Sequence, residues 1–126
     1  MFKRIDHVEI VPSDPERTID FYTNILGFKI KERRTIAAPE IDELVFLQLN
    51  DTMVELLAVK NPASISSEHW QVSYRRFCLE VEDMDRTVDY LKSKGIAITV
   101  GPITSGKSKR AEIEDPDGLS IELKQL

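Results

Sequence analysis

The chain has 126 residues, of which 41% are hydrophobic and 31% are charged, and its formal net charge at pH 7 is −5. This length fits one compact domain, or two half-domains that share a core, and the composition is that of an ordinary soluble globular protein. The acidic balance argues against a nucleic-acid partner, because such a partner requires a basic surface.

Membrane and targeting segments are not expected either. No apolar run approaches the roughly 18 residues of a membrane-spanning helix. The start Met1-Phe2-Lys3-Arg4 is positively charged, but acidic residues follow where a signal peptide would have an apolar stretch. The single cysteine, Cys78, excludes an internal disulfide and fits a reducing compartment. We therefore expect a cytoplasmic protein without a membrane partner.

The first half of the chain predicts a strand, a helix and three further strands. Either Ser13 or Asp14 is a suitable N-cap for the helix, Pro15 fits its first turn, and Gly27 fits its C-terminal cap. Asn50-Asp51 predicts a tight turn between the last two strands. The strands are expected at residues 5–11, 28–35, 44–49 and 53–59.

The second half predicts the same order after a linker. The linker covers residues 61–73 and is expected to include a short helical turn within 64–70. A helix follows at 83–94, and 101–109, which contains Gly101, Pro102 and Gly106, is expected to be a loop. Asp115-Pro116-Asp117-Gly118 is a strong turn signal. The strands are expected at 76–81, 96–100, 110–114 and 119–123.

The two halves are copies of one unit. Asp14 and Asp83 lie at equivalent points of the two patterns, as do Thr18 and Thr87, and the separation changes by only two residues along the repeat. We expect a single domain over 1–126, with repeat one at 1–60 and repeat two at 74–126. The fold class is α+β, with two βαβββ repeats that form a curled mixed sheet around a concave cleft.

The repeat also defines a candidate site. Side chains alternate along a strand, so His7 and Glu9 share the face opposite Val8 and Ile10. Glu55 lies in an apolar strand with no polar face, and a buried carboxylate must be paired, protonated or bound to a cation. In the second repeat, Arg76 is equivalent to His7 and Glu122 is equivalent to Glu55.

The duplicated βαβββ order, the strand His7, Glu55 and the Asp115-Pro116-Asp117-Gly118 turn before Glu122 resemble the vicinal oxygen chelate superfamily. This superfamily includes glyoxalase I, methylmalonyl-CoA epimerase, extradiol dioxygenases, and the fosfomycin and bleomycin resistance proteins. The resemblance covers nearly the whole chain. In glyoxalase-like members, a histidine on the first strand and a glutamate on the fourth strand of each half hold a metal. The resemblance thus implies a divalent metal, Zn, Ni, Mn or Fe, on His7, Glu55 and Glu122.

The same resemblance implies a glyoxalase-like, metal-dependent lyase or isomerase. It would act on a small oxygenated metabolite through an enediolate-type intermediate. Glu122 or Glu55 would be the catalytic base, and Glu9 would support a ligand or contact the substrate. A homodimer is expected, since pairing of two chains would cover an exposed sheet edge.

Arg76 departs from the family pattern, because a guanidinium does not ligate metals. It would turn out of the site, bind an anionic group of the substrate, or bridge Glu122 and Glu55 in place of the metal. With the metal retained, His69 or Tyr74 from the linker would complete the ligand set. The alternative function is a metal-free ligand-binding module of the bleomycin-resistance type. Glyoxalase I itself is disfavoured, because no arginine that could bind a glutathione carboxylate closely follows His7.

Overall fold

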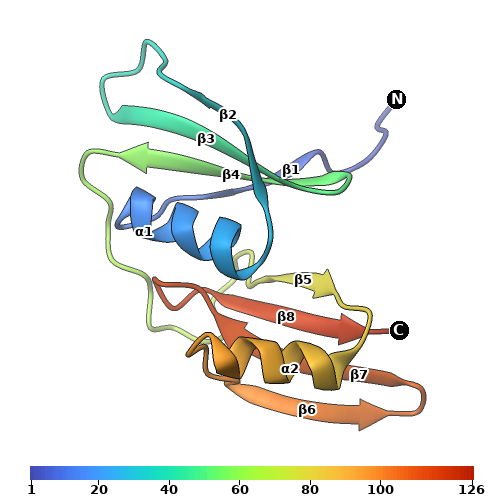
Figure 1. The fold of residues 1–126 in the computed structure, drawn as a ribbon. Coiled ribbons are helices and arrows are strands. Elements are labelled where there is room, and N and C mark those ends of the chain that lie inside the picture. Colours follow the sequence, from blue (N-terminus) through green and yellow to red (C-terminus); the bar gives the residue numbers. More distant parts are fainter. The chain divides into compact units, whose positions relative to one another are not determined.

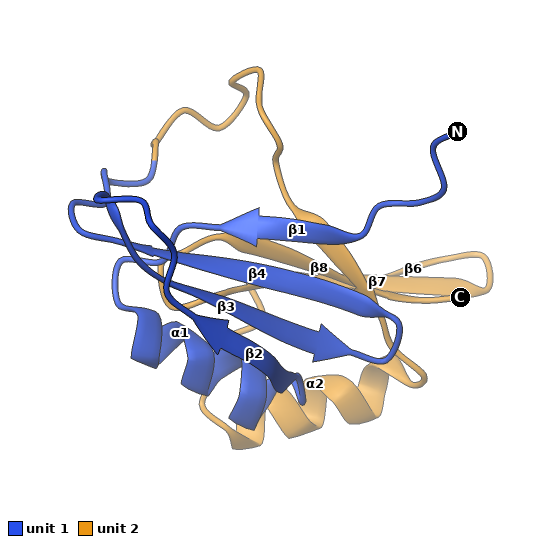
Figure 2. Cartoon of the chain, turned by 90° about the horizontal axis from the view of Figure 1, so that it is seen from above, with its two compact units in different colours: residues 1–65 blue, residues 66–126 orange.

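Each half of the chain forms its own four-stranded mixed sheet with one helical segment (Figure 1). The computed structural model describes residues 1–126, which divide into two units, Met1–Ile65 and Ser66–Leu126 (Figure 2). Two mixed sheets, each built from one βαβββ repeat, confirm the α+β fold class. Neither helix has the length and apolar character needed to cross a membrane.

Unit 1 has its strands in the order β1-β4-β3-β2. The pairing of β1 with β4 is parallel, and the other two pairings are antiparallel. The helix α1 covers one face of this sheet (Figure 1). The elements are β1 His7–Ile10, α1 Pro15–Asp20, a π-helical continuation η1 Phe21–Ile25, β2 Lys29–Arg34, β3 Ile41–Leu49 and β4 Thr52–Val59.

Unit 2 repeats this topology in the order β5-β8-β7-β6, again with one parallel pairing, between β5 and β8. The same connectivity in both units is what the duplicated sequence predicts. The elements are β5 Phe77–Glu80, α2 Met84–Ser93, β6 Val100–Ser105, β7 Ser108–Glu114 and β8 Ser120–Gln125.

The two helices begin with the same cap. Asp14 is the N-cap of α1, where its carboxylate accepts a hydrogen bond of 3.2 Å from the Arg17 amide. Asp83 caps α2 in the same way, with a 3.0 Å bond from the Arg86 amide. Such a cap satisfies an amide that has no partner within the helix. The repeated aspartate therefore fixes the start of the helix in both units.

Alternation along the central strands separates the core from the site. In β4, Val54, Leu56 and Ala58 are buried apolar side chains, and Glu55 points to the other face of the strand. The core of unit 2 is built in the same way. Its buried apolar side chains are Met84, Val88, Leu91, Ala111, Ile113, Ile121 and Leu123.

The expected strand at 96–100 and the expected loop at 101–109 are wrong. The strand β6 begins at Val100 and continues through Gly101 and Pro102 to Ser105, and β7 begins at Ser108. Proline is tolerated there because β6 is an edge strand, and the pairing with β7 is irregular between Val100 and Ile103. The helical turn expected within 64–70 is also wrong, because residues 61–76 contain no helix.

Candidate metal centre

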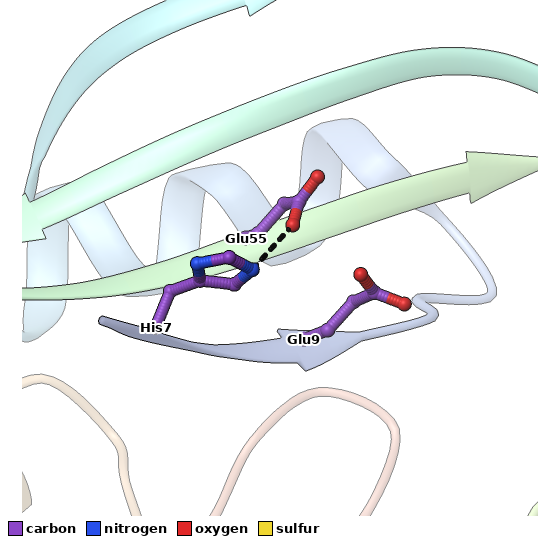
Figure 3. A group of neighbouring side chains, drawn as sticks. All are labelled: His7, Glu9 and Glu55. Atoms are coloured by element: carbon purple, nitrogen blue, oxygen red, sulfur yellow. Dashed lines mark ion pairs between the residues drawn. The ribbon is translucent and has the colours of Figure 1, made fainter. Parts of the chain in front are cut away.

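Three side chains of unit 1 converge on one face of its sheet. His7 and Glu9 project from the same side of β1, and Glu55 projects toward them from β4 (Figure 3). The parallel register pairs Glu9 directly with Glu55, and His7 lies two residues before Glu9. One ligand atom from each of the three residues lies within 4.8 Å of the others. Of the ligands that the family resemblance implies, His7, Glu55 and Glu122, the first two lie in this group, and the register adds Glu9.

His7 lies between two carboxylates. Its Nδ1 is 2.9 Å from Asp6 Oδ2, and its Nε2 is 2.9 Å from Glu55 Oε2. The ring also packs edge-on against Phe46 of β3, with 5.7 Å between ring centroids. A carboxylate on one nitrogen fixes the orientation of the imidazole and directs the other nitrogen, a common arrangement of metal-binding histidines. Asp6 thus directs Nε2 toward Glu55.

The 2.9 Å contact between His7 Nε2 and Glu55 Oε2 requires a proton on one of the two atoms, because both would otherwise be hydrogen-bond acceptors. An ionised Asp6 can only accept, so Nδ1 donates to it, and Nε2 then meets Glu55 Oε2 either with a second proton or through a protonated carboxyl group. The hydrogen bond with Asp6 is the main cause that raises the pKa of His7, and the charges of Glu55 and Glu9 raise it further. A divalent cation can take the place of this proton.

Glu55 has an unusual environment for a carboxylate. The residue is only 6% exposed, and burial is the main cause that raises its pKa, followed by the negative charge of Glu9. Two carboxylates and an imidazole in such proximity are a donor set for a first-row divalent ion. The residues of unit 1 therefore fit a metal by their chemistry and by their convergence.

Unit 2 has ion pairs at the equivalent place. The Arg76 guanidinium contacts Glu112 through Nη1 and Glu122 through Nε, the latter at 3.5 Å. Arg110 Nη1 lies 4.0 Å from the other oxygen of Glu122. Two arginines and two glutamates form this group, so its formal charge is zero. Cys78 stands opposite Glu122 in the β5–β8 register, where Glu9 stands opposite Glu55 in unit 1.

Glu112 was not among the residues predicted from the sequence. It lies on β7 directly opposite Glu122, as Phe46 lies directly opposite Glu55. The signal was present in the alternation of β7, where Glu112 interrupts the apolar residues Ala111 and Ile113. Its partner, however, is 36 residues earlier in the chain, and only the sheet register brings the two together.

The linker residues have local partners within unit 2. His69 Nε2 lies 3.1 Å from an Arg75 nitrogen, and the Arg75 guanidinium stacks 4.6 Å from the centre of the Trp70 ring. Trp70 is 78% exposed, and Tyr74 is fully exposed. These contacts form a surface group of their own around Trp70.

The comparisons with known proteins agree with this architecture. The sequence model of the Glyoxalase/Bleomycin resistance protein/Dioxygenase superfamily matches residues 4–123. The chain belongs to this superfamily. Within the superfamily, it is 31% identical to the lactoylglutathione lyase of Haemophilus influenzae over 124 residues, which are 94% of this chain and 90% of that protein.

Two further relatives extend the comparison. The lactoylglutathione lyase GLX1 of Arabidopsis thaliana is 28% identical over 98% of this chain, but the chain spans only 44% of the length of that protein. Among solved structures, the trypanothione-dependent glyoxalase I of Leishmania major has a TM-score of 0.78 and 28% identity, and the match covers 97% of this chain and 86% of that one. The glyoxalase-like fold thus extends over the whole chain.

Proposed function

We propose that this superfamily member is a metal-dependent lyase or isomerase of the glyoxalase type, which acts on a small oxygenated metabolite. The observation that carries the proposal is the convergence of His7, Glu9 and Glu55, whose ligand atoms lie within 4.8 Å of one another. The similarity to lactoylglutathione lyases supports the reaction class. A divalent ion bound there would polarise a substrate oxygen and acidify the neighbouring C–H.

His7 and Glu55 are the two ligands that we assign first. Asp6 orients the His7 ring so that Nε2 faces the site. Glu55 is also our choice for the group that moves a proton, because it is a buried carboxylate among the proposed ligands, and burial raises its pKa in the metal-free protein. Glu9 lies opposite Glu55 in the register of β1 and β4, and it is exposed. It is therefore suited to contact an incoming substrate or to complete the ligand set.

Glu122 is the third ligand that the family pattern predicts, and a catalytic role for it stays a prediction. In unit 2 its two oxygens face Arg76 and Arg110. Arg76 likewise stays the predicted group for an anionic part of the substrate. Two matched variants separate these roles. Loss of metal affinity in Glu9→Gln but not in Glu122→Gln would assign the third ligand to unit 1, and the reverse would assign it to Glu122.

The test of the proposal is the metal content of the protein purified without added metal or chelator. Elemental analysis is expected to find close to one equivalent of a transition metal per chain, before or after reconstitution, and His7→Ala is expected to lose it. Less than about a tenth of an equivalent in the reconstituted natural protein would contradict the proposal. That result would favour the metal-free, ligand-binding alternative, which the ion pairs of Arg76 support.

The substrate is tested separately from the metal. Lactoylglutathione is the compound in the names of the relatives, and its formation or loss can be followed with the metal-loaded protein. A small 2-hydroxy acid without the peptide portion is the second arm. Turnover of the second compound alone would place the activity outside the lactoylglutathione lyases, and Glu55→Gln should abolish either turnover.

A further inference from the structure

The two units differ at three register positions around one equivalent glutamate. Around Glu55 of unit 1 these positions are held by His7, Phe46 and Glu9. Around Glu122 of unit 2 they are held by Arg76, Glu112 and Cys78. The glutamate itself is the same in both, so the surroundings decide what each carboxylate can bind.

We propose that Arg76 and Glu112 form a coupled pair that withholds Glu122 from metal binding, with Glu112 as the residue that positions Arg76. The metal is then bound by the donor set of unit 1. This inference rests on the proposed function for its biological meaning, but its test does not depend on that function.

The first support is that neither member of the pair fits the site without the other. Glu112 and Glu122 lie directly opposite each other on antiparallel strands, where like charges repel. The Glu112 side chain is only 9% exposed and contacts the Arg76 guanidinium. Arg76 itself is 17% exposed, and without Glu112 its charge would rely on the 3.5 Å contact with Glu122. A buried charge that loses its partner is strongly destabilising, so the two residues depend on each other.

The second support is the charge of the two groups. Asp6, Glu9 and Glu55 surround the single imidazole of His7, and this excess of carboxylates attracts a cation. In unit 2 two guanidinium groups face two carboxylates, and no excess remains. A guanidinium offers no lone pair to a metal and repels a dication, so Glu122 is neutralised by Arg76 and Arg110 instead.

The third support is the change at the other two neighbours of the glutamate. Phe46, which packs on the His7 ring, is replaced in unit 2 by Glu112, whose carboxylate is paired with the Arg76 guanidinium. Glu9 is replaced by Cys78, so a thiol stands where unit 1 has a carboxylate. Unit 2 therefore differs from unit 1 at every neighbour of the glutamate, and the histidine is replaced by a group that cannot ligate a metal.

The test reverses the pair with Arg76→His/Glu112→Phe, which gives unit 2 the residue types of His7, Phe46 and Glu55. The control is Arg76→Met/Glu112→Phe, which has the same apolar neighbour but no imidazole. Binding of Zn²⁺ and of Ni²⁺ alone is measured by calorimetry and equilibrium dialysis. We expect the reversed chain, relative to the control, to gain a second bound ion or on the order of tenfold tighter binding.

Equal binding by the reversed chain and its control would overturn the proposal. A second measurement covers the case in which the reversed chain does not fold. Arg76→Met and Glu112→Phe are each expected to lower the melting temperature more than the control double variant does, because the double variant leaves no unpaired charge at this pair. Additive losses would show that the two residues are not coupled, and would also overturn the proposal.

Failure of the proposed function gives a different result. A natural protein that binds no metal contradicts the assignment of His7 and Glu55, whereas a gain of metal binding in the reversed chain still supports the role of Arg76 and Glu112. If the His7→Ala variant still binds one ion per chain and loses it on the further change Glu122→Gln, unit 2 binds metal with Arg76 in place. That result would overturn the inference and the assignment of His7 as a ligand, but not the metal dependence of the protein.

Discussion

At the scale of single residues, the environment of a carboxylate decides its chemistry more than its identity does. Glu55 is buried beside an imidazole and another carboxylate, and Glu122 is held between two guanidinium groups. The same residue type at equivalent positions thus has a raised pKa in the first case and two cationic partners in the second. The protons and cations available to each follow from these neighbours.

Metal binding at His7 should raise the free energy of unfolding of the protein. An ion that binds only the folded state adds about 2.7 kcal/mol to the free energy of unfolding at a concentration 100 times its dissociation constant. Thermal unfolding monitored by circular dichroism should therefore shift upward by several degrees with Zn²⁺ or Ni²⁺, and a chelator should reverse the shift. His7→Ala should show no shift. An equal shift in His7→Ala would place the ion elsewhere.

Asp115 gives a second residue-scale prediction. Its Oδ1 accepts hydrogen bonds from the amides of Asp117 and Leu119, at 2.8 and 3.0 Å, and its Oδ2 is buried with no hydrogen-bond partner. We expect Asp115→Ala to lower the free energy of unfolding by about 1–3 kcal/mol, because two partly buried amides lose their acceptor. Asp115→Asn retains an acceptor and should lose less.

The pH dependence of this effect has a defined sign. Burial is the main cause that raises the pKa of Asp115 above its ordinary value of 3.8, so the folded state binds the proton more tightly than the unfolded state. Its contribution to stability is then fully present below 3.8 and falls as the pH rises toward the folded-state pKa. In urea unfolding between about pH 4 and 7, the free energy of unfolding of Asp115→Asn should rise relative to that of the natural protein as the pH increases. A constant difference over this range would contradict the raised pKa.

At the scale of elements, the strand β6 depends on Gly101. Its φ is +81°, and an added Cβ would lie 2.7 Å from the Arg110 carbonyl oxygen on β7. This close approach and the positive φ explain why a glycine occurs at position 101 within a strand. The glycine and the proline correctly indicated an unusual backbone. The expected loop is instead part of the strand β6, because edge strands accommodate such irregularities.

Gly101→Ala is therefore expected to destabilise the protein more than Gly106→Ala. Gly106 also has a positive φ, of +61°, but a Cβ there would meet nothing within 4 Å, so its cost is conformational and about 1 kcal/mol. Gly101→Ala adds a backbone clash and should cost roughly 2–3 kcal/mol in denaturant unfolding. Equal effects of the two variants would show that the backbone near Gly101 can move apart without cost.

At the scale of the whole molecule, duplication explains most of the fold. Both units have the same strand order, the same parallel pairing and the same aspartate cap. The duplicated units then diverged in charge, since unit 1 has a cation-attracting group around His7 and unit 2 has a neutral group around Arg76. Because of this divergence, the role of one repeat cannot be inferred from that of the other.

The whole molecule is also where we predict a homodimer. Large apolar side chains are exposed along the segment before β5, including Trp70, Val72 and Tyr74. Sizing with light scattering at micromolar concentration should give twice the mass of one chain. A monomer under these conditions would contradict the prediction, and the exposed side chains would then need another explanation.

The sequence by itself determined the features that depend on local pattern and repetition. Alternation placed His7 and Glu9 on one face, the aspartates and glycines bounded both helices, and the duplication identified Arg76 as the counterpart of His7. Only the tertiary structure decided which residues meet across strands. The pairing of Glu9 with Glu55 and of Arg76 with Glu112 depends on sheet register. Register is fixed by contacts between distant segments, which no local propensity encodes.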